Sequence, residues 1–299
     1  MSEPPVAIVV LTYDGFQPVR EALLSVGSLT YPSYDVIVVD NGSSDTTSLR
    51  IRERFPRAEL LAGEVKLGVA GGFNVGLRRV VKGEWKYALV MHNDVEPEPS
   101  MLSELVATAE ARPSVAAVSP KIHLFWDRER LLSAGGLLAG GRFPVRWRGY
   151  DEIDRGQYEE DCEVDCGTGA AMLVNVETVR EVGLLDPQLR HYEDVDWCVR
   201  ARAAGYSSYY SHRAAAWRLA VRTAPDRPAR AREAGRSAAF LMRRHGSFGR
   251  RLLFVLAQVG ALAAALPQRL IRRRRSPLSR ARGALEAMSA VLAAPPRDR

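Results

Sequence analysis

The sequence has few cysteines, and their arrangement does not build a site. Cys162, Cys166 and Cys198 are its three cysteines, an odd number without a Cys-x-x-Cys pair. This spacing argues against a disulfide framework and against a cysteine-based zinc site. Reduced thiols, as in the cytosol, are the expected state.

Long hydrophobic runs are also lacking. The longest covers residues 252–266, has 15 residues and is interrupted by Gln258 and Gly260. A helix that crosses a bilayer needs about 20 apolar residues. Residues 6–11 are apolar as well, but acid and proline precede them instead of a basic segment, which argues against a secretory signal. We therefore expect a cytoplasmic protein.

Acidic residues are scarce only at the end of the chain. Residues 250–299 hold 11 arginines and two acids, a net charge of +9, which leaves −2 for residues 1–249. Apolar residues flanked by arginine in this segment suit a helix that lies in the interface of an anionic membrane. A helix packed on the body of the protein, with a solvated basic end, is the alternative. Nucleic acid is not an expected partner, because no recognition module accompanies the tail.

Strand-like and helix-like segments alternate through the first third of the chain. Apolar runs suited to buried strands occupy residues 6–11, 34–39, 58–61 and 87–95. This alternation predicts βαβ units, and so an α/β fold with a mainly parallel central sheet flanked by helices. Further on we expect strands at residues 115–119, 122–126, 169–174 and 207–210, hairpins or a flap at 131–148, and helices at 100–111, 176–182, 192–204, 231–244 and 250–271. The expected domains are residues 1–225 and a helical, basic extension at 226–299.

The first two predicted strands end in polar residues, Thr12 and Tyr13 after one and Asp40, Asn41 and Gly42 after the other. In an open α/β sheet, ligands bind beyond the carboxyl ends of the strands. A carboxylate at Asp40 can accept the imide N–H of uracil or thymine, and the small residues after it leave room for the ring. Capping of the next helix is the alternative role for Asp40.

A glycine-rich segment, residues 68–76, leads into the next helix. Glycine permits close approach of the backbone to a ligand, so Gly68 and Gly72 are candidate nucleotide contacts and Asn74 is a candidate partner of the sugar or ribose. The spacing is not that of a dinucleotide fingerprint, which argues against a nicotinamide cofactor. A flexible connector is the alternative.

The strand at residues 87–95 stops at His92, Asn93 and Asp94. A carboxylate with a neighbouring imidazole or amide suits a divalent cation that shares oxygens with a diphosphate. His212 lies just past a later predicted strand and, with Asp94, is a candidate to complete a metal site. A plain polar turn at 92–94 and a structural histidine are the alternatives.

Three carboxylates stand within four residues at Glu193, Asp194 and Asp196. Such groups raise one another's proton affinity when partly buried, and a carboxylate in this state can act as a general base. Helical spacing places Glu193 and Asp196 on one face, with Asp196 within reach of Arg200, and leaves Asp194 to face the cleft. An acidic first turn that complements the helix dipole is the alternative.

Taken together, these segments resemble the family-two inverting glycosyltransferases, in particular the rhamnosyltransferase and galactofuranosyltransferase-like branch. The resemblance rests on residues 9–13 (VVLTY), 38–45 (VVDNGSSD), 67–76 (LGVAGGFNVG), 92–94 (HND), 167–174 (GTGAAMLV) and 192–200 (YEDVDWCVR). It implies a GT-A fold, a dTDP- or UDP-linked sugar donor with Asn93 among its contacts, and Mg²⁺ or Mn²⁺ at an Asp-x-Asp position.

In family terms, Asp94 matches the second Asp of that motif, and His92 stands where the first is usual. His212 is the candidate for a later metal-binding His. Asp194 matches the catalytic base, while Glu193, Asp196 and Trp197 would lie on the acceptor side or behind the base.

The implied function is transfer of a sugar, with rhamnose as one candidate, to a glycan or polyprenyl-linked acceptor in cell-envelope polysaccharide synthesis. The enzyme would be peripheral on the cytoplasmic face of the membrane. A catalytically inactive GT-A protein that binds carbohydrate or acts as a scaffold is an alternative, motivated by His92. A nucleotidyltransferase would need basic residues straight after the first strand, where residues 12–15 have none.

Overall fold

The structure is a computed structural model that describes residues 3–139, 144–219 and 227–271. The chain divides into two compact units. One comprises residues 1–137, 147–187 and 193–220, and the other comprises 138–146, 188–192 and 221–299. The domain boundary expected between residues 225 and 226 lies outside the described residues.

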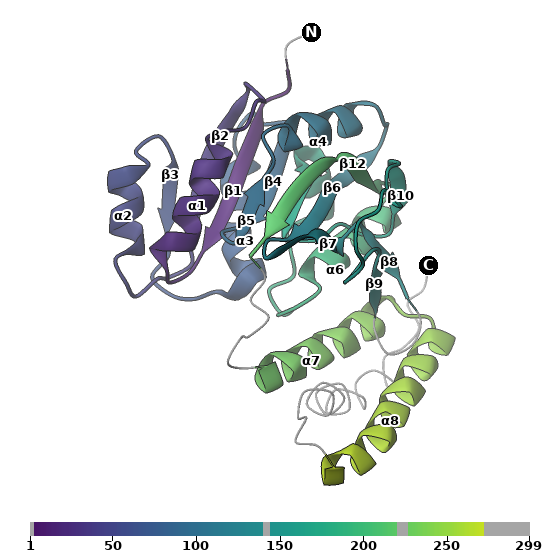
Figure 1. Ribbon diagram of the computed structural model, residues 1–299. Coiled ribbons are helices and arrows are strands. Elements are labelled where there is room, and N and C mark those ends of the chain that lie inside the picture. Colours follow the sequence, from purple (N-terminus) through teal and green to yellow (C-terminus); the bar gives the residue numbers. More distant parts are fainter. Residues whose placement is uncertain (1–2, 140–143, 220–226, 272–299) are drawn as a thin grey trace. The chain divides into compact units, whose positions relative to one another are not determined.

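A sheet of ten strands forms the centre of the first unit (Figure 1). Eight of the strands form the path β10-β12-β6-β11-β4-β1-β2-β3, and β5 and β7 pair with β12 and β6 beside it. In chain order the strands are β1 (Val6–Thr12), β2 (Tyr34–Asp40), β3 (Glu59–Ala62), β4 (Tyr87–His92), β5 (Val95–Pro97), β6 (Val115–Leu124), β7 (Asp127–Ser133), β10 (Cys162–Val164), β11 (Ala171–Asn175) and β12 (Ser207–Arg218). The helices of this unit are α1 (Phe16–Val26), α2 (Thr47–Arg54), α3 (Gly68–Val80), α4 (Met101–Glu110), α5 (Val176–Val182) and α6 (Glu193–Ala203).

The direction of the strands confirms the predicted α/β class. The neighbours β3, β2, β1 and β4 are parallel, with Val10 of β1 in register with Val38 on one side and Met91 on the other. β11 runs antiparallel between β4 and β6, and β12 is parallel to β6. The longer strands therefore mostly share one direction. Parallel strands covered on both faces need continuous apolar runs, and every residue of β1 is buried.

Helices cover both faces of this sheet. Val6, Ile8 and Val10 belong to the main hydrophobic cluster, which also contains buried side chains of α1 and α4. Val9, which points to the opposite face, meets α3, where a Cβ on Gly76 would lie 2.4 Å from its Cγ1. The glycine-rich segment is therefore the first part of helix α3 and not a connector. Its glycines let this helix approach the sheet closely.

Two predicted strand boundaries are corrected. Residues 115–124 form one continuous strand, β6, through Pro120, which lies opposite Ser211 at a bulge of β12. β12 extends to Arg218 instead of ending at residue 210. Its last residues pair with β6 on one side and with β5 on the other. This double pairing outweighs the bulge between Ser211 and Ala215 and keeps the chain extended.

Residues 131–148, expected to form hairpins, contain the end of β7 and a two-stranded sheet of β8 (Gly136–Leu138) and β9 (Val145–Trp147). Hairpin structure is confirmed for this segment, apart from residues 140–143, which lie outside the described residues.

The second unit contains α7 (Arg227–His245) and α8 (Phe248–Ile271), close to the two helices predicted there. They pack through Ala238, Ala239, Met242 and Phe254. In the part of the chain that the structure describes, no helix is both long and apolar enough to cross a membrane. The basic sequence after residue 271 lies outside the described residues.

Candidate active site

The loops that follow β1 and β2 are tied together by hydrogen bonds. The Asn41 N–H donates to the Thr12 carbonyl at 2.9 Å, the Asp14 N–H to the Ser43 hydroxyl at 2.9 Å, and the Ser44 N–H to the Asp14 carboxylate at 2.8 Å. The two polar strand ends predicted to share one edge of the sheet therefore do so. Tyr13 is partly exposed on this edge, and the Lys66 ammonium lies 3.4 Å from the centre of its ring.

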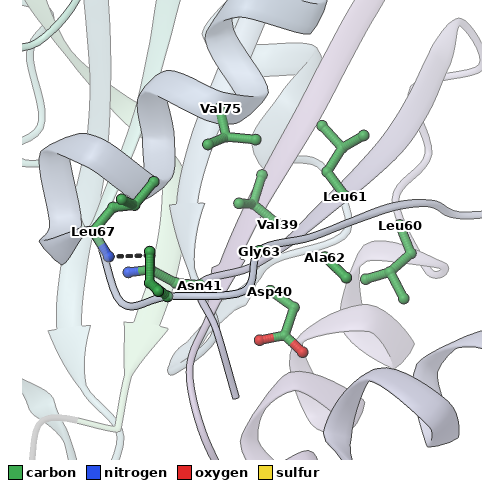
Figure 2. Close-up of a pocket in the computed structure, with 10 residues that line it drawn as sticks. Val39, Asp40, Asn41, Leu60, Leu61, Ala62, Gly63, Leu67 and Val75 are labelled. Carbon is green, nitrogen blue, oxygen red and sulfur yellow. Dashed lines mark hydrogen bonds between the residues drawn. The ribbon is translucent and has the colours of Figure 1, made fainter. Parts of the chain in front are cut away.

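A cavity of about 370 Å³ opens beside the end of β2. Figure 2 shows Val39 and Val75 on one side of it and the Asp40 carboxylate on another, with Leu60 and Ala62 nearby. This volume lies within the range of small-molecule pockets. The buried Asp40 accepts hydrogen bonds from the Ser43 N–H at 2.9 Å and from the Ser48 hydroxyl. Each carboxylate oxygen has a second lone pair, so Asp40 can brace its loop and still accept from a ligand.

Asn41 and Gly42 shape this cavity through their contacts with the segment at residues 63–68, part of which lines it. The Asn41 amide donates to the Gly68 carbonyl at 2.9 Å. It also accepts from the Leu67 N–H at 2.9 Å, the bond drawn in Figure 2. Gly42 has a φ of +80°, and a Cβ there would lie 2.6 Å from the carbonyl carbon of Val65. Both residues thus hold the segment at 63–68 against the end of β2.

Asn74 and Gly72 have packing roles, which corrects the sequence interpretation of Asn74. The Asn74 side chain is buried, donates to the Leu185 carbonyl at 2.8 Å and accepts from the Leu185 N–H at 3.0 Å. Its amide is therefore committed to the backbone and not directed at a sugar. A Cβ on Gly72 would lie 2.5 Å from Leu11 Cδ1, so this glycine is required for contact between α3 and β1.

The end of β4 is joined to the same edge. The Asn93 side-chain amide donates to the Thr12 hydroxyl at 2.9 Å, and the Asn93 N–H donates to the Leu11 carbonyl at 3.1 Å. The His92 ring meets the Phe73 ring edge-on, with 5.3 Å between the centroids. Residues 92–94 and the nucleotide-side loops therefore form one continuous region of the first unit.

Asp94 is paired with Arg218, a residue that the sequence analysis did not select. Arg218 Nε lies 3.2 Å from each carboxylate oxygen of Asp94, and the Leu219 N–H donates to the Asp94 carbonyl at 2.8 Å. Arg218 was missed because the last strand was expected to end at residue 210. The run of small apolar residues at 214–216 was the available signal that the strand continues.

Glu193 and Asp194 begin helix α6. Asp194 accepts from the Gly169 N–H at 2.6 Å and from the Val195 N–H at 2.8 Å. Glu193 is buried, and its Oε2 has no hydrogen-bond partner among the described residues. Burial, followed by the charge of Asp194, raises the pKa of Glu193 to about 8. Burial also raises the pKa of Asp194, although the backbone donors act in the opposite direction.

Asp196 and Trp197 make structural contacts, which agree with the second of their two expected places, behind the base, and not with the acceptor side. The fully buried Asp196 accepts from Arg200 Nε at 2.8 Å, as the sequence predicted, and Arg200 also donates to the carbonyls of Val182 and Leu184 at 2.7 Å. Trp197 Nε1 donates to the Gly183 carbonyl at 2.9 Å. Together they anchor the turn at residues 182–184 to α6.

The expected grouping of His92, Asp94 and His212 around a metal ion is not found. His212 Nδ1 lies 2.8 Å from Asp161. His212 precedes Arg218, the partner of Asp94, by six positions on β12. At about 3.3 Å per residue, this separation along the strand is on the order of 20 Å. Among the described residues no three His, Cys, Asp or Glu side chains are placed to hold a metal ion. Burial and the charge of Arg218 lower the pKa of His92 to about 4. The donor set therefore does not fit the divalent cation that the family resemblance implied.

The acidic helix end belongs to the same region as Asp94. The charge of Arg218 lowers the proton affinity of His92, Glu193 and Asp194, which places the guanidinium within electrostatic reach of all three. Three features thus lie along one edge of the sheet: the cavity with the Asp40 carboxylate, the Arg218 guanidinium, and the Asp194 carboxyl with its raised pKa. This arrangement can hold an anionic nucleotide and remove a proton from a hydroxyl.

The fold matches solved glycosyltransferases of the GT-A class. A mannosyltransferase from Pyrobaculum calidifontis, solved with GDP-Man and Mn²⁺, superposes with a TM-score of 0.62 at 18% identity, over 98% of this chain and 86% of that chain. Identity at this level supports the fold alone.

The family follows from the sequence comparison. Residues 7–181 match the model of glycosyl transferase family 2, and the chain belongs to this family. It is 25% identical over 215 residues to glycosyltransferase AglE of Haloferax volcanii, covering 70% of this chain and 65% of that protein. It is 27% identical over 223 residues to an N-acetylglucosaminyl-diphospho-decaprenol L-rhamnosyltransferase of Mycobacterium tuberculosis, covering 68% and 72%. The chain spans between 24% and 72% of the length of the curated relatives it matches.

Proposed function

We propose that this glycosyltransferase transfers a sugar, with inversion, from a nucleoside-diphosphate donor to a hydroxyl of a glycan or lipid-linked acceptor. Rhamnose is the first sugar to test, because the Mycobacterium tuberculosis relative is a rhamnosyltransferase with a decaprenol-linked acceptor. Cell-envelope polysaccharide synthesis is the setting that such an acceptor indicates.

The donor base and ribose are assigned to the cavity beside Asp40. The carboxylate accepts the imide N–H of uracil or thymine, which present the same edge, so UDP- and dTDP-linked donors both fit. Tyr13 stands at the exposed side of this edge, and its ring can stack on the base. Thr12 and Asn93, whose side chains are hydrogen-bonded at 2.9 Å, link the loop next to the base cavity to Asp94.

In the proposed reaction, the acceptor oxygen attacks the anomeric carbon from the face opposite the diphosphate. The bond from that carbon to the diphosphate oxygen breaks, and its electron pair leaves with the diphosphate. Asp194 takes the proton from the acceptor hydroxyl as the new bond forms. A single displacement of this kind inverts the anomeric configuration. No step is assigned to a metal ion.

One observation carries the proposal: hydrogen bonds and one ion pair connect Asp40, Asn93 and Arg218, from separate segments of the chain, along one edge of the sheet that also bears Asp194. Burial of an ionisable carboxyl group costs folding stability, so the buried carboxyl with raised pKa beside this edge is not explained by stability. Strongly perturbed carboxyl groups at a ligand edge favour a catalytic role.

The test is a panel of nucleotide sugars offered to the purified protein, with release of the nucleoside diphosphate measured by chromatography. UDP- and dTDP-linked sugars are the donors, and a short prenyl-diphosphate glycan is the acceptor. We expect turnover with one donor and an inverted anomeric centre in the product by NMR. Binding of carbohydrate without turnover of any donor would favour the alternative, an inactive GT-A binding or scaffold protein, which the occupied Asp94 carboxylate also suits.

We further propose that α8 attaches the protein to an anionic membrane surface, where a lipid-linked acceptor would be found. Phe248, Leu252, Leu253, Leu256 and Val259 are between 43% and 74% exposed. Four of them follow one another at intervals of three or four residues, which places them on one side of the helix. Arginines precede and follow this helix in the sequence, as expected at an interface with anionic lipid.

A further inference from the structure

Asp94 is the acidic group best placed for a metal, and its carboxylate already has a cationic partner. Arg218 Nε lies 3.2 Å from both oxygens, and each side chain is only about a quarter exposed, at 26% and 27%. A divalent cation on this carboxylate would have to displace the guanidinium or lie beside it. Two positive charges at that distance repel strongly in a partly buried site.

The neighbouring groups do not compensate for this. Mg²⁺ and Mn²⁺ prefer oxygen ligands in octahedral geometry. His92 offers nitrogen, and its ring is packed edge-on against Phe73. The Asn93 amide is bonded to Thr12. Residues 3–139, 144–219 and 227–271 contain no second carboxylate that completes a metal cluster with Asp94.

Arg218 itself is suited to a diphosphate. A guanidinium has five N–H donors in a planar fork that matches phosphate oxygens. Only Nε is used on Asp94, and neither Nη group is bonded to a described residue. Asp94 therefore orients the fork at a fixed position while leaving its outer edge for a ligand.

We propose that Arg218, oriented by Asp94, faces the diphosphate of the donor and takes the place of a divalent cation in this enzyme. The inference rests on the proposed function. When the anomeric bond breaks, the electron pair goes to the diphosphate oxygen, and the guanidinium offsets the charge that develops there. Asp94 is a positioning residue, because it acts through Arg218.

The position of Arg218 agrees with this role. On one side Asp94 is adjacent to Asn93, which is bonded to Thr12 at the nucleotide edge. On the other side the charge of Arg218 reaches Glu193 and Asp194, where the acceptor would be deprotonated. A diphosphate between the base cavity and Asp194 would pass the guanidinium.

The test measures binding of UDP and dTDP by titration calorimetry, in EDTA and again with Mn²⁺, together with the electron paramagnetic resonance signal of Mn²⁺. For the unaltered protein we expect the preferred nucleotide to bind with an affinity that changes less than threefold between EDTA and Mn²⁺. The Mn²⁺ signal should match that of free nucleotide and metal without protein. Donor turnover should persist in EDTA.

Three variants separate charge from geometry. Arg218→Gln should weaken nucleotide binding at least tenfold, and Arg218→Lys should recover part of this loss because it keeps the charge but not the fork. Arg213→Gln, an exposed arginine earlier on the same strand, is the matched control and should bind as the unaltered protein does.

The outcomes are distinguishable. Binding or turnover that needs Mn²⁺ in the unaltered protein, or an Arg218→Gln variant that folds and binds normally, overturns the inference and leaves the proposed function intact. Failure to bind any nucleoside diphosphate under any condition contradicts the proposed function, and the inference with it. The EDTA comparison needs no variant, so it decides even where Arg218→Gln does not fold.

Discussion

Arg218 Nε lies 3.2 Å from both carboxylate oxygens of Asp94, although 124 positions separate the two residues in the chain. The pair connects the end of the last strand of the sheet to the turn after β4. Its consequence is electrostatic, because the guanidinium lies within reach of His92, Glu193 and Asp194. One arginine thus influences the proton affinity of three titratable groups near the proposed reaction centre.

Replacing Asp194 with asparagine should remove the general base. We expect the rate of transfer to fall by about 10²–10⁴-fold, while the affinity for the nucleoside diphosphate changes less than threefold. Steady-state kinetics and titration calorimetry measure the two quantities. If Asp194→Asn retains transfer and Glu193→Gln abolishes it, the base is Glu193 instead.

The free energy of unfolding should decrease as pH rises between the pKa of Glu193 in the unfolded state and its higher pKa in the folded state. The pKa of Glu193 is about 8 in the folded protein against an ordinary value of 4.5, so the folded state holds the extra proton and binds more protons than the unfolded state between these values. The free energy of unfolding therefore decreases with increasing pH in that window. Urea unfolding at pH 5.5 and pH 8 should show this decrease.

Glu193→Gln should reduce that pH dependence, because the neutral amide has no proton to lose. Glu53→Gln, at an exposed glutamate of α2, is the control and should leave the slope unchanged. Equal slopes for the unaltered protein and Glu193→Gln would show that this carboxyl does not control the stability profile.

Asn74 should prove to be a structural residue. Substitution by alanine leaves the buried N–H and carbonyl of Leu185 without partners, so we expect a loss of roughly 2–4 kcal/mol in the free energy of unfolding. Below the melting temperature of the variant, nucleotide affinity should stay within threefold of normal. A large loss of affinity with little loss of stability would return Asn74 to the ligand site.

Membrane attachment should depend on the exposed apolar side of α8. Changing Leu252, Leu253, Leu256 and Val259 to serine should abolish sedimentation with vesicles that contain anionic lipid. The control is Leu24→Ser with Leu49→Ser, two comparably exposed leucines at 48% and 54% on other helices. Sedimentation should also weaken as salt is raised, because the attraction of arginines to lipid is screened. If the α8 variant still sediments with the vesicles, the lipid interaction does not run through this face.

Local patterns predicted much of the fold and part of the candidate site. Residues 6–11 and 34–39 form parallel neighbours because continuous β-branched runs tolerate burial on both faces. Thr12 and Asp40 meet because parallel strands end at the same edge. Asp196 pairs with Arg200 because their spacing of four lies along one side of a helix.

Other site residues could not be assigned from such patterns. An asparagine in a glycine-rich segment has the same sequence appearance whether it binds a sugar or the backbone of Leu185, 111 positions away. His212 follows an apolar strand like a ligand would, yet it meets Asp161, because the bulge at 211–215 sets which groups lie beside it. Trp197 was expected on the acceptor side or behind the base, and only packing shows that it anchors Gly183.

The amino-acid sequence by itself determined the α/β class, the family, the order of the strands along the chain and the chemical types gathered at their ends, since these follow from short-range periodicity and from motifs. Only the tertiary structure decided which of those groups meet. Because β12 continues past its bulge, Arg218 lies beside Asp94. This pairing depends on contacts between residues that are distant in the chain, and no local sequence pattern records such contacts.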